Sequence, residues 1–187
     1  TVSNIASSGL KTLACRIPSN IIAKKIIKKF NGIIAAPSAN LSTKLSPTNK
    51  QHVIKNFGKS IYVVNGGKTV YGIESTVVDL TGKIPKILRS GVISNEEIIK
   101  IIPSVLTKNK SLKKIISPGQ LKKHYSPGIP IKLNCKRADN KAAFIVFGKK
   151  YKNNNKNIFN LSKNGNLDEA ARKLYKTFRK IKNLGFK

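Results

Sequence analysis

Short polar side chains follow an apolar run near the start of the chain, in a pattern that suits ligand binding. Residues 33–36 are apolar and predict a buried strand, which Pro37 ends because proline has no N–H to give to a sheet. Ser38 and Asn40 come next and carry hydrogen-bonding groups of short, fixed reach. Ligands of α/β sheets usually bind past such strand ends. An ordinary strand-to-loop turn has the same pattern, so this stretch alone leaves both interpretations open.

More polar groups are found at the ends of other predicted strands. They are Thr12, Arg16, Ser75 and Arg89. Arginine near hydroxyls and small-residue turns suits an anionic ligand such as a carboxylate or phosphate. The sequence has no Ser-His-Asp arrangement, no paired carboxylates and no Walker-type loop, and Glu74 and Asp79 are the only acidic residues nearby. We therefore expect a site that binds and orients anions rather than one that performs acid–base chemistry.

The elements that must position these residues alternate between strands and helices. The predicted strands cover residues 12–17, 33–36, 61–64, 74–80, 86–89 and 142–147. Capping residues predict helix starts at Ser19, at Thr48 with Gln51, at Ser94 with Glu97, and at Asn166 with Glu169. The first strand–helix–strand unit favours parallel pairing. The pattern predicts an α/β fold, and His52 is expected on the surface of its helix.

Composition limits the class of protein. The chain of 187 residues carries 37 Lys and Arg against 7 Asp and Glu, a net charge of +30 that predicts attraction to polyanions. Only 5 of these cations are arginines, whereas dedicated nucleic-acid readers depend on Arg, so codon bias of an AT-rich genome also explains the excess. Two isolated cysteines, no long apolar run and no signal pattern predict a cytoplasmic protein that does not cross a membrane. The absence of Met predicts a fragment of a longer reading frame.

The C-terminal half contains a predicted linker. Residues 104–130 are rich in Lys, Ser and Pro, yet they include His124 and Tyr125 between two prolines. Disordered linkers rarely contain an aromatic residue, so we expect this pair to dock on something. Residues 131–187 predict one strand and one amphipathic helix, too few to close a core. We expect them to be part of a small α/β domain that continues past the end of the chain.

Five motifs in order carry a family resemblance. They are Ala-Pro-Ser-Ala-Asn-Leu-Ser at 36–42, Ser-Pro-Thr at 46–48, Gly-Gly at 66–67, Gly-Ile-Glu-Ser-Thr-Val-Val-Asp at 72–79 and Ile-Leu-Arg-Ser-Gly at 87–91. This series resembles the YrdC-like domain, and the linker motif around His124 and Tyr125 resembles that of its two-domain members, the threonylcarbamoyl-adenylate synthases. The resemblance implies a twisted mixed sheet with flanking helices in residues 1–103, the linker at 104–130 and part of a smaller α/β domain at 131–187.

The same resemblance implies an enzyme that joins L-threonine, bicarbonate and ATP into threonylcarbamoyl-adenylate, with release of pyrophosphate and with Mg²⁺ to offset charge. The product would feed the machinery that transfers threonylcarbamoyl groups to tRNA. By the resemblance, Arg16, Ala36 and Ser75 face L-threonine. The nucleotide would be held by Thr12, Ser38, Ser46, Arg89 and Tyr125, with Asn40 in support.

Two departures from the family's pattern set further expectations. The family's Lys-x-Arg segment does not occur in the sequence, so we expect the fragment by itself not to form the adenylate. Ser90 stands where the family usually has Pro, a minor change. Three other interpretations remain open: a non-enzymatic basic RNA-binding module, a carbamoyl-transfer maturation enzyme, which should show cysteine pairs for zinc, and a plain α/β domain with chance motifs.

Overall fold

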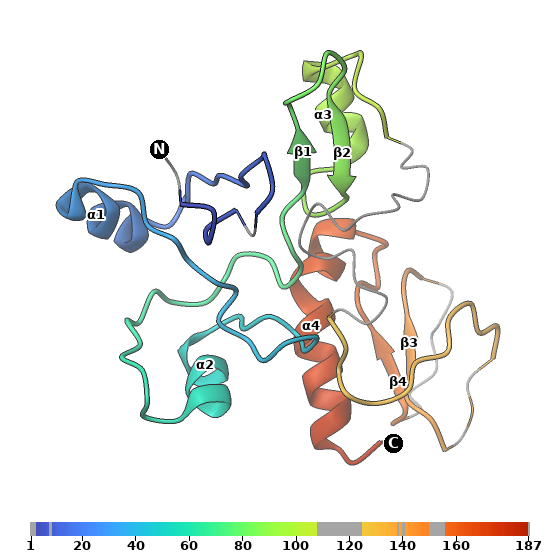
Figure 1. The fold of residues 1–187 in the computed structure, drawn as a ribbon. Coiled ribbons are helices and arrows are strands. Elements are labelled where there is room, and N and C mark those ends of the chain that lie inside the picture. Colours follow the sequence, from blue (N-terminus) through green and yellow to red (C-terminus); the bar gives the residue numbers. More distant parts are fainter. Residues whose placement is uncertain are drawn as a thin grey trace.

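The computed structural model describes residues 3–7, 9–107, 125–137, 139, 141–149 and 156–186 (Figure 1). The helices are α1 (Ile21–Phe30), α2 (Lys50–Phe57), α3 (Asn95–Ile101) and α4 (Leu167–Asn183). The strands are β1 (Val77–Asp79), β2 (Lys86–Arg89), β3 (Phe144–Val146) and β4 (Ile158–Asn160). This mixture confirms the predicted α/β class. No helix in the described residues is long and apolar enough to cross a membrane.

The strands pair in two small sheets. β1 and β2 are antiparallel, with Val78 opposite Ile87 and a register shift between Val77 and Val78. β3 and β4 are parallel, with Phe144 paired to Ile158. In Figure 1 the first sheet lies beside α3 and the second beside α4. Both strand orientations occur, as expected for a mixed fold, but the described strands form two separate sheets instead of one.

A small apolar core fixes β2. Ile87 is 1% exposed and packs with Ile98 of α3 and with Val105. The backbone N–H of Ile87 also donates to the carbonyl oxygen of Leu106 at 2.9 Å. Burial of these branched side chains stabilises the contact between strand and helix. Because Arg89 is the last residue of β2, the same core sets the position of its backbone.

The starts of α3 and α4 are as predicted. At α3 the Ser94 hydroxyl accepts from the Glu97 N–H, and the Glu97 carboxylate accepts from the Ser94 N–H, which makes a capping box. At α4 the Asn166 side chain accepts from the N–H of Glu169. Both caps satisfy N–H groups that have no partner within the helix.

The first two helices begin one residue later than predicted. Asn20 caps α1 in place of Ser19, and Asn49 caps α2 in place of Thr48. Asn and Ser are about equally good caps, so neighbouring candidates cannot be ranked from the sequence. The prediction that His52 lies on the surface also fails, because the residue is half-buried. Its backbone N–H donates to the side chain of Asn49, which caps the helix.

The predicted strands at residues 12–17, 33–36 and 61–64 are wrong for the described chain. These segments form no strand, and most of their large apolar side chains are exposed, with Ile17 and Tyr62 both at 93%. A strand exists only where a neighbouring backbone accepts and donates its hydrogen bonds. Within the described residues these segments have no such neighbour, so the predicted strand–helix–strand unit is not formed, and α1 stands to one side in Figure 1.

The remaining strand predictions differ from the structure mainly in length. β1 covers only Val77–Asp79 of the predicted segment 74–80, and β3 only Phe144–Val146 of segment 142–147. β2 has the predicted bounds. β4 was not predicted, because its two apolar residues are preceded by a run of Asn and Lys that indicates irregular structure.

Candidate functional site

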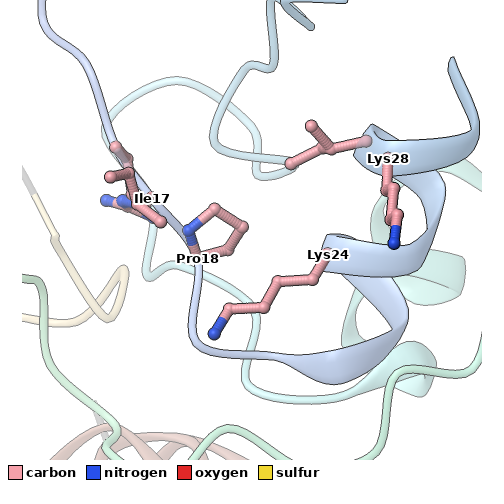
Figure 2. A pocket seen from close by; sticks show the side chains of 6 residues that line it. Ile17, Pro18, Lys24 and Lys28 are labelled. Atoms are coloured by element: carbon pink, nitrogen blue, oxygen red, sulfur yellow. The ribbon is translucent and has the colours of Figure 1, made fainter. Parts of the chain in front are cut away.

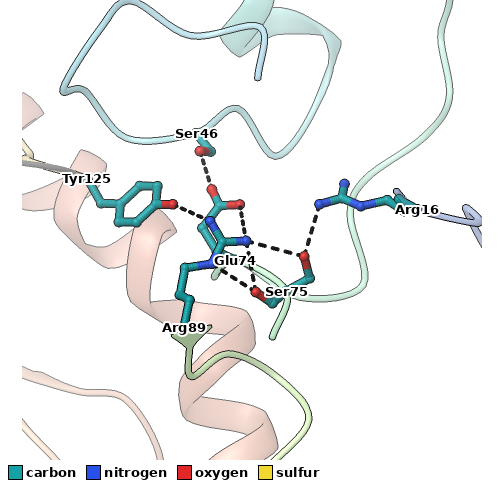
Figure 3. A network of polar contacts seen from close by, with 6 residues as sticks. All are labelled: Arg16, Ser46, Glu74, Ser75, Arg89 and Tyr125. Atoms are coloured by element: carbon teal, nitrogen blue, oxygen red, sulfur yellow. Dashed lines mark hydrogen bonds and ion pairs between the residues drawn. The ribbon is translucent and has the colours of Figure 1, made fainter. Parts of the chain in front are cut away.

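Arg89 is the centre of a polar cluster that Figure 3 shows from close by. Its Nε and Nη2 donate to the carbonyl oxygen of Ser75 at 3.0 and 2.9 Å. Its Nη1 donates to the hydroxyl oxygen of Tyr125 at 2.7 Å. Its Nη2 lies 3.9 Å from Oε2 of Glu74, and the two side chains are 13% and 21% exposed. The guanidinium is thus nearly buried and held by groups from distant parts of the sequence.

A second guanidinium reaches the same serine. Arg16, which precedes α1, donates from Nη2 to Oγ of Ser75 at 2.9 Å (Figure 3). Nη2 of Arg89 lies 3.4 Å from that oxygen. Two positive groups at one hydroxyl favour an anion bound next to it. Arg16 is exposed, so this side of the cluster is open to solvent.

Gly91 allows the close approach that places Ser75. A β-carbon at position 91 would lie 2.4 Å from the carbonyl carbon of Ser75 and 2.5 Å from the carbonyl oxygen of Glu74. The N–H of Val92 also donates to this Glu74 oxygen at 3.3 Å. Any side chain at position 91 would displace the backbone at residues 74–76, so the Ser-Gly that follows Arg89 is part of the site's framework.

The loop that carries Ser46 forms the third part of the cluster. The Ser46 hydroxyl donates to Oε1 of Glu74 (Figure 3). Asn40 shapes this loop, because its Nδ2 donates to the carbonyl oxygens of Leu41 and Lys44 at 2.8 and 3.1 Å. Asn40 therefore acts on the turn that precedes Ser46 and not on the arginines directly.

Three residues from the predicted site make no hydrogen bond to this cluster. Thr12, Ala36 and Ser38 are exposed, and no hydrogen bond found in the described chain joins them to Arg89 or Ser75. They lie in or directly after the extended segments that have no strand partner.

Sequence reasoning missed two residues of α4 that contact the cluster. Tyr175 is 5% exposed, and its ring centroid lies 6.2 Å from that of Tyr125. Nη2 of Arg179 donates to the carbonyl oxygen of Leu45 at 3.3 Å and to that of Ser46. The spacing i, i+4 of Tyr175 and Arg179 puts both on one face of an amphipathic helix, which is the one hint in the sequence. Such a pair usually lies on the exposed face of a helix and contacts no other element.

Electrostatics keep the two tyrosines of the cluster neutral. Burial raises the pKa of Tyr125 above its ordinary value, and the nearby Glu74 carboxylate raises it further, while Arg89 opposes both effects. The pKa of Tyr175 is raised more strongly, again mainly by burial. Because a free tyrosine already titrates near pH 10, both phenols keep their protons at neutral pH.

Two open hollows flank the cluster. One, of about 240 Å³, is shown in Figure 2 and is lined by Arg16, Ile17, Pro18, Lys24, Ile27 and Lys28. The other, of about 530 Å³, is lined by Thr43, Lys44, Ser126, Gly128, Ile129 and Pro130. The first lies next to the Arg16 side of the cluster and the second next to Tyr125. Neither is lined by Ser75 or Arg89, which bond to each other.

The sequence matches two family profiles that together cover nearly the whole chain. Residues 1–91 match the Sua5, YciO and YrdC family, described as telomere recombination. Residues 93–187 match the C-terminal domain of threonylcarbamoyl-AMP synthase. The chain belongs to the threonylcarbamoyl-AMP synthase family. This membership confirms the resemblance drawn from the five motifs.

The chain matches only part of the length of individual family members. The threonylcarbamoyl-AMP synthase of Pyrococcus abyssi is 41% identical over 135 residues, which are 70% of this chain and 40% of the archaeal protein. That of Bacillus subtilis is 41% identical over 130 residues, 67% of this chain and 37% of the bacterial one. The crystal structure of P. abyssi Sua5 complexed with L-threonine matches with a TM-score of 0.78 at 31% identity, over 99% of this chain and 59% of that one. The chain therefore spans about two fifths of these curated relatives' length.

Proposed function

We propose that this chain takes part in the synthesis of L-threonylcarbamoyl-adenylate from L-threonine, bicarbonate and ATP. One observation carries the proposal: Arg16 and Arg89 meet at Ser75 in a chain of the threonylcarbamoyl-AMP synthase family. A pair of guanidinium groups suits a reaction between two anions, a carbamate and a nucleotide phosphate. The solved P. abyssi relative, which was crystallised with L-threonine, supports the amino-acid half of this proposal.

L-Threonine is assigned to the Arg16 side of the cluster. The Arg16 guanidinium would bind the α-carboxylate, because arginine and carboxylate form charge-assisted hydrogen bonds in a matched geometry. The Ser75 hydroxyl, which already bonds to Arg16, would orient the amino acid, with the backbone at Ala36 beside it. The hollow next to Arg16 gives the threonine side chain an open approach.

ATP is assigned to the Arg89 side. Arg89 would bind a phosphate oxygen with the Ser46 hydroxyl, in competition with the Glu74 carboxylate that both groups contact in the described structure. The neutral ring of Tyr125 would cover the nucleotide. Thr12 and Ser38 are assigned to the same nucleotide, although no hydrogen bond in the described chain joins either of them to Arg89.

The proposed chemistry needs alignment more than a side-chain nucleophile. The amino nitrogen of threonine bonds to the carbon of bicarbonate with loss of water, which gives a carbamate. A carbamate oxygen then bonds to the α-phosphorus of ATP, and the bond from that phosphorus to the pyrophosphate oxygen breaks. Holding the two anions in line and neutralising their charge accounts for most of the catalysis in such phosphoryl chemistry. The guanidinium groups of Arg16 and Arg89 supply both effects.

Mg²⁺ is assigned to the ATP phosphates. In the described part of the chain, no three His, Cys, Asp or Glu side chains come together as a metal site, and Glu74 is the carboxylate of the cluster. Mg²⁺ usually keeps several waters and binds through one or two carboxylates plus substrate phosphates, which fits this set of donors. When bound, the ion would reduce the negative charge on the phosphates, while Arg89 and Ser46 orient them.

RNA is a second candidate partner. The net charge of +30 favours binding to a polyanion, and the proposed product serves the machinery that modifies tRNA. A non-enzymatic RNA-binding module is therefore the alternative function, and it predicts RNA binding that L-threonine and ATP do not affect.

Calorimetric titration of the purified chain with L-threonine and with ATP·Mg²⁺ tests the proposal. We expect both ligands to bind, and Arg89→Ala to remove ATP binding because the nearly buried cation of the nucleotide side is lost. Lys29→Ala is the matched control, since Lys29 is an exposed cation of α1 and no described contact connects it to the cluster. Failure of the wild-type chain to bind either ligand, or unchanged ATP binding by Arg89→Ala, contradicts the proposal.

A further inference from the structure

Helix α4 contacts three separate parts of the candidate site, although it belongs to the other end of the chain. Figure 3 shows it passing behind Tyr125 and the arginine cluster. Helix α4 contacts the loop at Ser46, the turn before Glu74 and the side chain of Tyr125. Each of these segments supplies a group to the cluster around Arg89.

The first contact is made by Arg179. Its Nη2 donates to the main-chain carbonyls of Leu45 and Ser46, the second being the residue whose hydroxyl bonds to Glu74. Arg179 is itself half-buried, and burial lowers the pKa of its guanidinium. A half-buried cation that bonds to two consecutive carbonyls restrains the loop's main chain in a way that a flexible surface lysine cannot.

The second contact is between rings. Tyr175 lies one turn before Arg179 and packs against Tyr125 with an angle of 34° between the ring planes. The same Tyr125 accepts the hydrogen bond from Arg89. Because Tyr175 is 5% exposed, its ring forms a fixed surface against which Tyr125 is held.

The third contact is through the backbone. The N–H of Gly72 donates to the carbonyl oxygen of Ala171 at 3.1 Å, and a β-carbon at Gly72 would lie 3.0 Å from the carbonyl oxygen of Arg172. The guanidinium of Arg172 also lies 5.4 Å from the ring centre of Tyr71. The turn that leads to Glu74 and Ser75 therefore lies directly on α4.

We propose that Tyr175 and Arg179 of α4 are positioning residues for the nucleotide side of the site, where they hold Tyr125 and Ser46 against Arg89. This inference rests on the proposed function, because it assigns that side to ATP. It gives the C-terminal region a part in the reaction: Tyr175 and Arg179 complete the ATP side, whereas no hydrogen bond or ring contact among the described residues joins either of them to Arg16 or Ser75, on the threonine side.

Separate titrations of the full chain with ATP·Mg²⁺ and with L-threonine provide the first test. Arg179→Ala and Tyr175→Leu should each raise the Kd for ATP by about tenfold, the effect of losing one good contact, and change the Kd for L-threonine less than about twofold. Tyr175→Phe keeps the ring and should bind ATP as the wild type does. Lys176→Ala, an exposed residue of the same helix, is the matched control.

Amide hydrogen exchange without ligand provides a second test that does not depend on the proposed function. The N–H of Ser126 donates to the carbonyl oxygen of Thr43 at 2.8 Å, between the two segments that α4 holds. Arg179→Ala should speed exchange at Ser126 and leave Gly72, which bonds to the α4 backbone, as slow as in the wild type. Faster exchange at both positions would mean that α4 has undocked as a whole, which overturns a local positioning role.

The two measurements separate the possible failures. Unchanged ATP affinity in Arg179→Ala and Tyr175→Leu, with a wild-type chain that binds ATP, overturns the positioning role alone. Equal losses for ATP and L-threonine also overturn it, because they indicate general destabilisation. A wild-type chain that binds neither ligand contradicts the proposed function, and the exchange rate at Ser126 then still decides whether Arg179 holds the loop.

Discussion

Nη1 of Arg89 lies 2.7 Å from the hydroxyl oxygen of Tyr125, which is 36 positions further along the chain. This bond attaches Tyr125, in a segment predicted as linker, to the end of β2, as expected for a docked His-Tyr pair, while His124 lies outside the described residues. Tyr125 has a φ of 55°, in the left-handed region that residues with a β-carbon rarely adopt. Such a backbone is kept only when other contacts hold the side chain, here Arg89 and Tyr175.

Replacement of Arg89 by Lys should lose most of the ATP affinity, although the charge is kept. An ammonium group is a single point, so it cannot bond to the Ser75 carbonyl and the Tyr125 hydroxyl with the geometry of the guanidinium. We expect a loss of about tenfold or more, since hydrogen bonds to charged groups contribute about 1.5–3 kcal/mol each. Titration calorimetry with ATP·Mg²⁺ measures this, and ATP affinity equal to that of the wild type would show that only the charge of Arg89 matters.

Tyr125→Phe should separate the hydrogen bond from ring packing. The variant keeps the ring next to Tyr175 and removes the acceptor for Nη1 of Arg89. We expect ATP affinity to fall by about tenfold or more, since one hydrogen bond to a charged group contributes about 1.5–3 kcal/mol. Tyr62→Phe is the matched control, because Tyr62 is 93% exposed. A loss of ATP affinity in the control as large as in Tyr125→Phe would contradict the assigned role.

Gly91→Ala should damage both stability and binding. Its methyl group would lie 2.4 Å from backbone atoms of Ser75 and Thr76, so the chain there must move. We expect the melting temperature to fall by several degrees, as for a loss of about 1–3 kcal/mol from overpacking, together with loss of L-threonine and ATP binding. Gly82→Ala is the control, since its nearest contact would be at an ordinary 3.7 Å. A Gly91→Ala chain that melts and binds like the Gly82→Ala chain would disprove the close-approach argument.

His52 should make the chain less stable as the pH falls through the range just below its ordinary pKa. Burial lowers the pKa of His52 in the folded chain, and Arg179 and Lys55 lower it further. The Thr48 N–H also donates to its Nδ1 at 3.2 Å, which requires that nitrogen to be unprotonated.

The unfolded chain then binds more protons than the folded chain, so the free energy of unfolding rises with pH until His52 is neutral in both states. This contribution is complete above the ordinary value of 6.5 and is lost as the pH falls below it, toward the lowered folded pKa. Melting temperatures of the wild type and of His52→Gln between about pH 5 and 8 measure it. The variant should show a smaller slope over this interval, and identical slopes would show that His52 does not titrate differently on folding.

The affinity of the chain for RNA should fall as the salt concentration rises, and ligands of the candidate site should not change it. A net charge of +30 made almost entirely of lysines predicts binding through phosphates without base reading. Filter-binding or fluorescence assays with duplex RNA should therefore show an affinity that falls steeply between about 50 and 200 mM salt. L-Threonine and ATP·Mg²⁺ should leave it unchanged. Affinity that persists at the higher salt concentration, or that depends on base sequence, would contradict this charge-driven mode of binding. A chain that binds RNA in this salt-dependent way but binds neither L-threonine nor ATP·Mg²⁺ would favour the RNA-binding alternative.

The family, the helices and most residues of the polar cluster could be predicted from the sequence by itself. Helical spacing and capping residues are local, so α3 and α4 begin where Ser94 and Asn166 predict. Arg16, Ser46, Ser75, Arg89 and Tyr125, which were chosen from short motifs, do gather in one cluster. Their ligands stay a prediction, as do the domain bounds at residues 103 and 130.

Only the tertiary structure decided which of these residues meet and what holds them there. Strands at 12–17, 33–36 and 61–64 depend on distant backbone partners, which an apolar run does not reveal, and the described chain provides none. In the same way, nothing next to Tyr175 or Arg179 in the sequence indicates that α4 packs on Tyr125 and on the Ser46 loop. Long-range contacts are set by the packing of whole elements, whereas local patterns report only the neighbours along the chain.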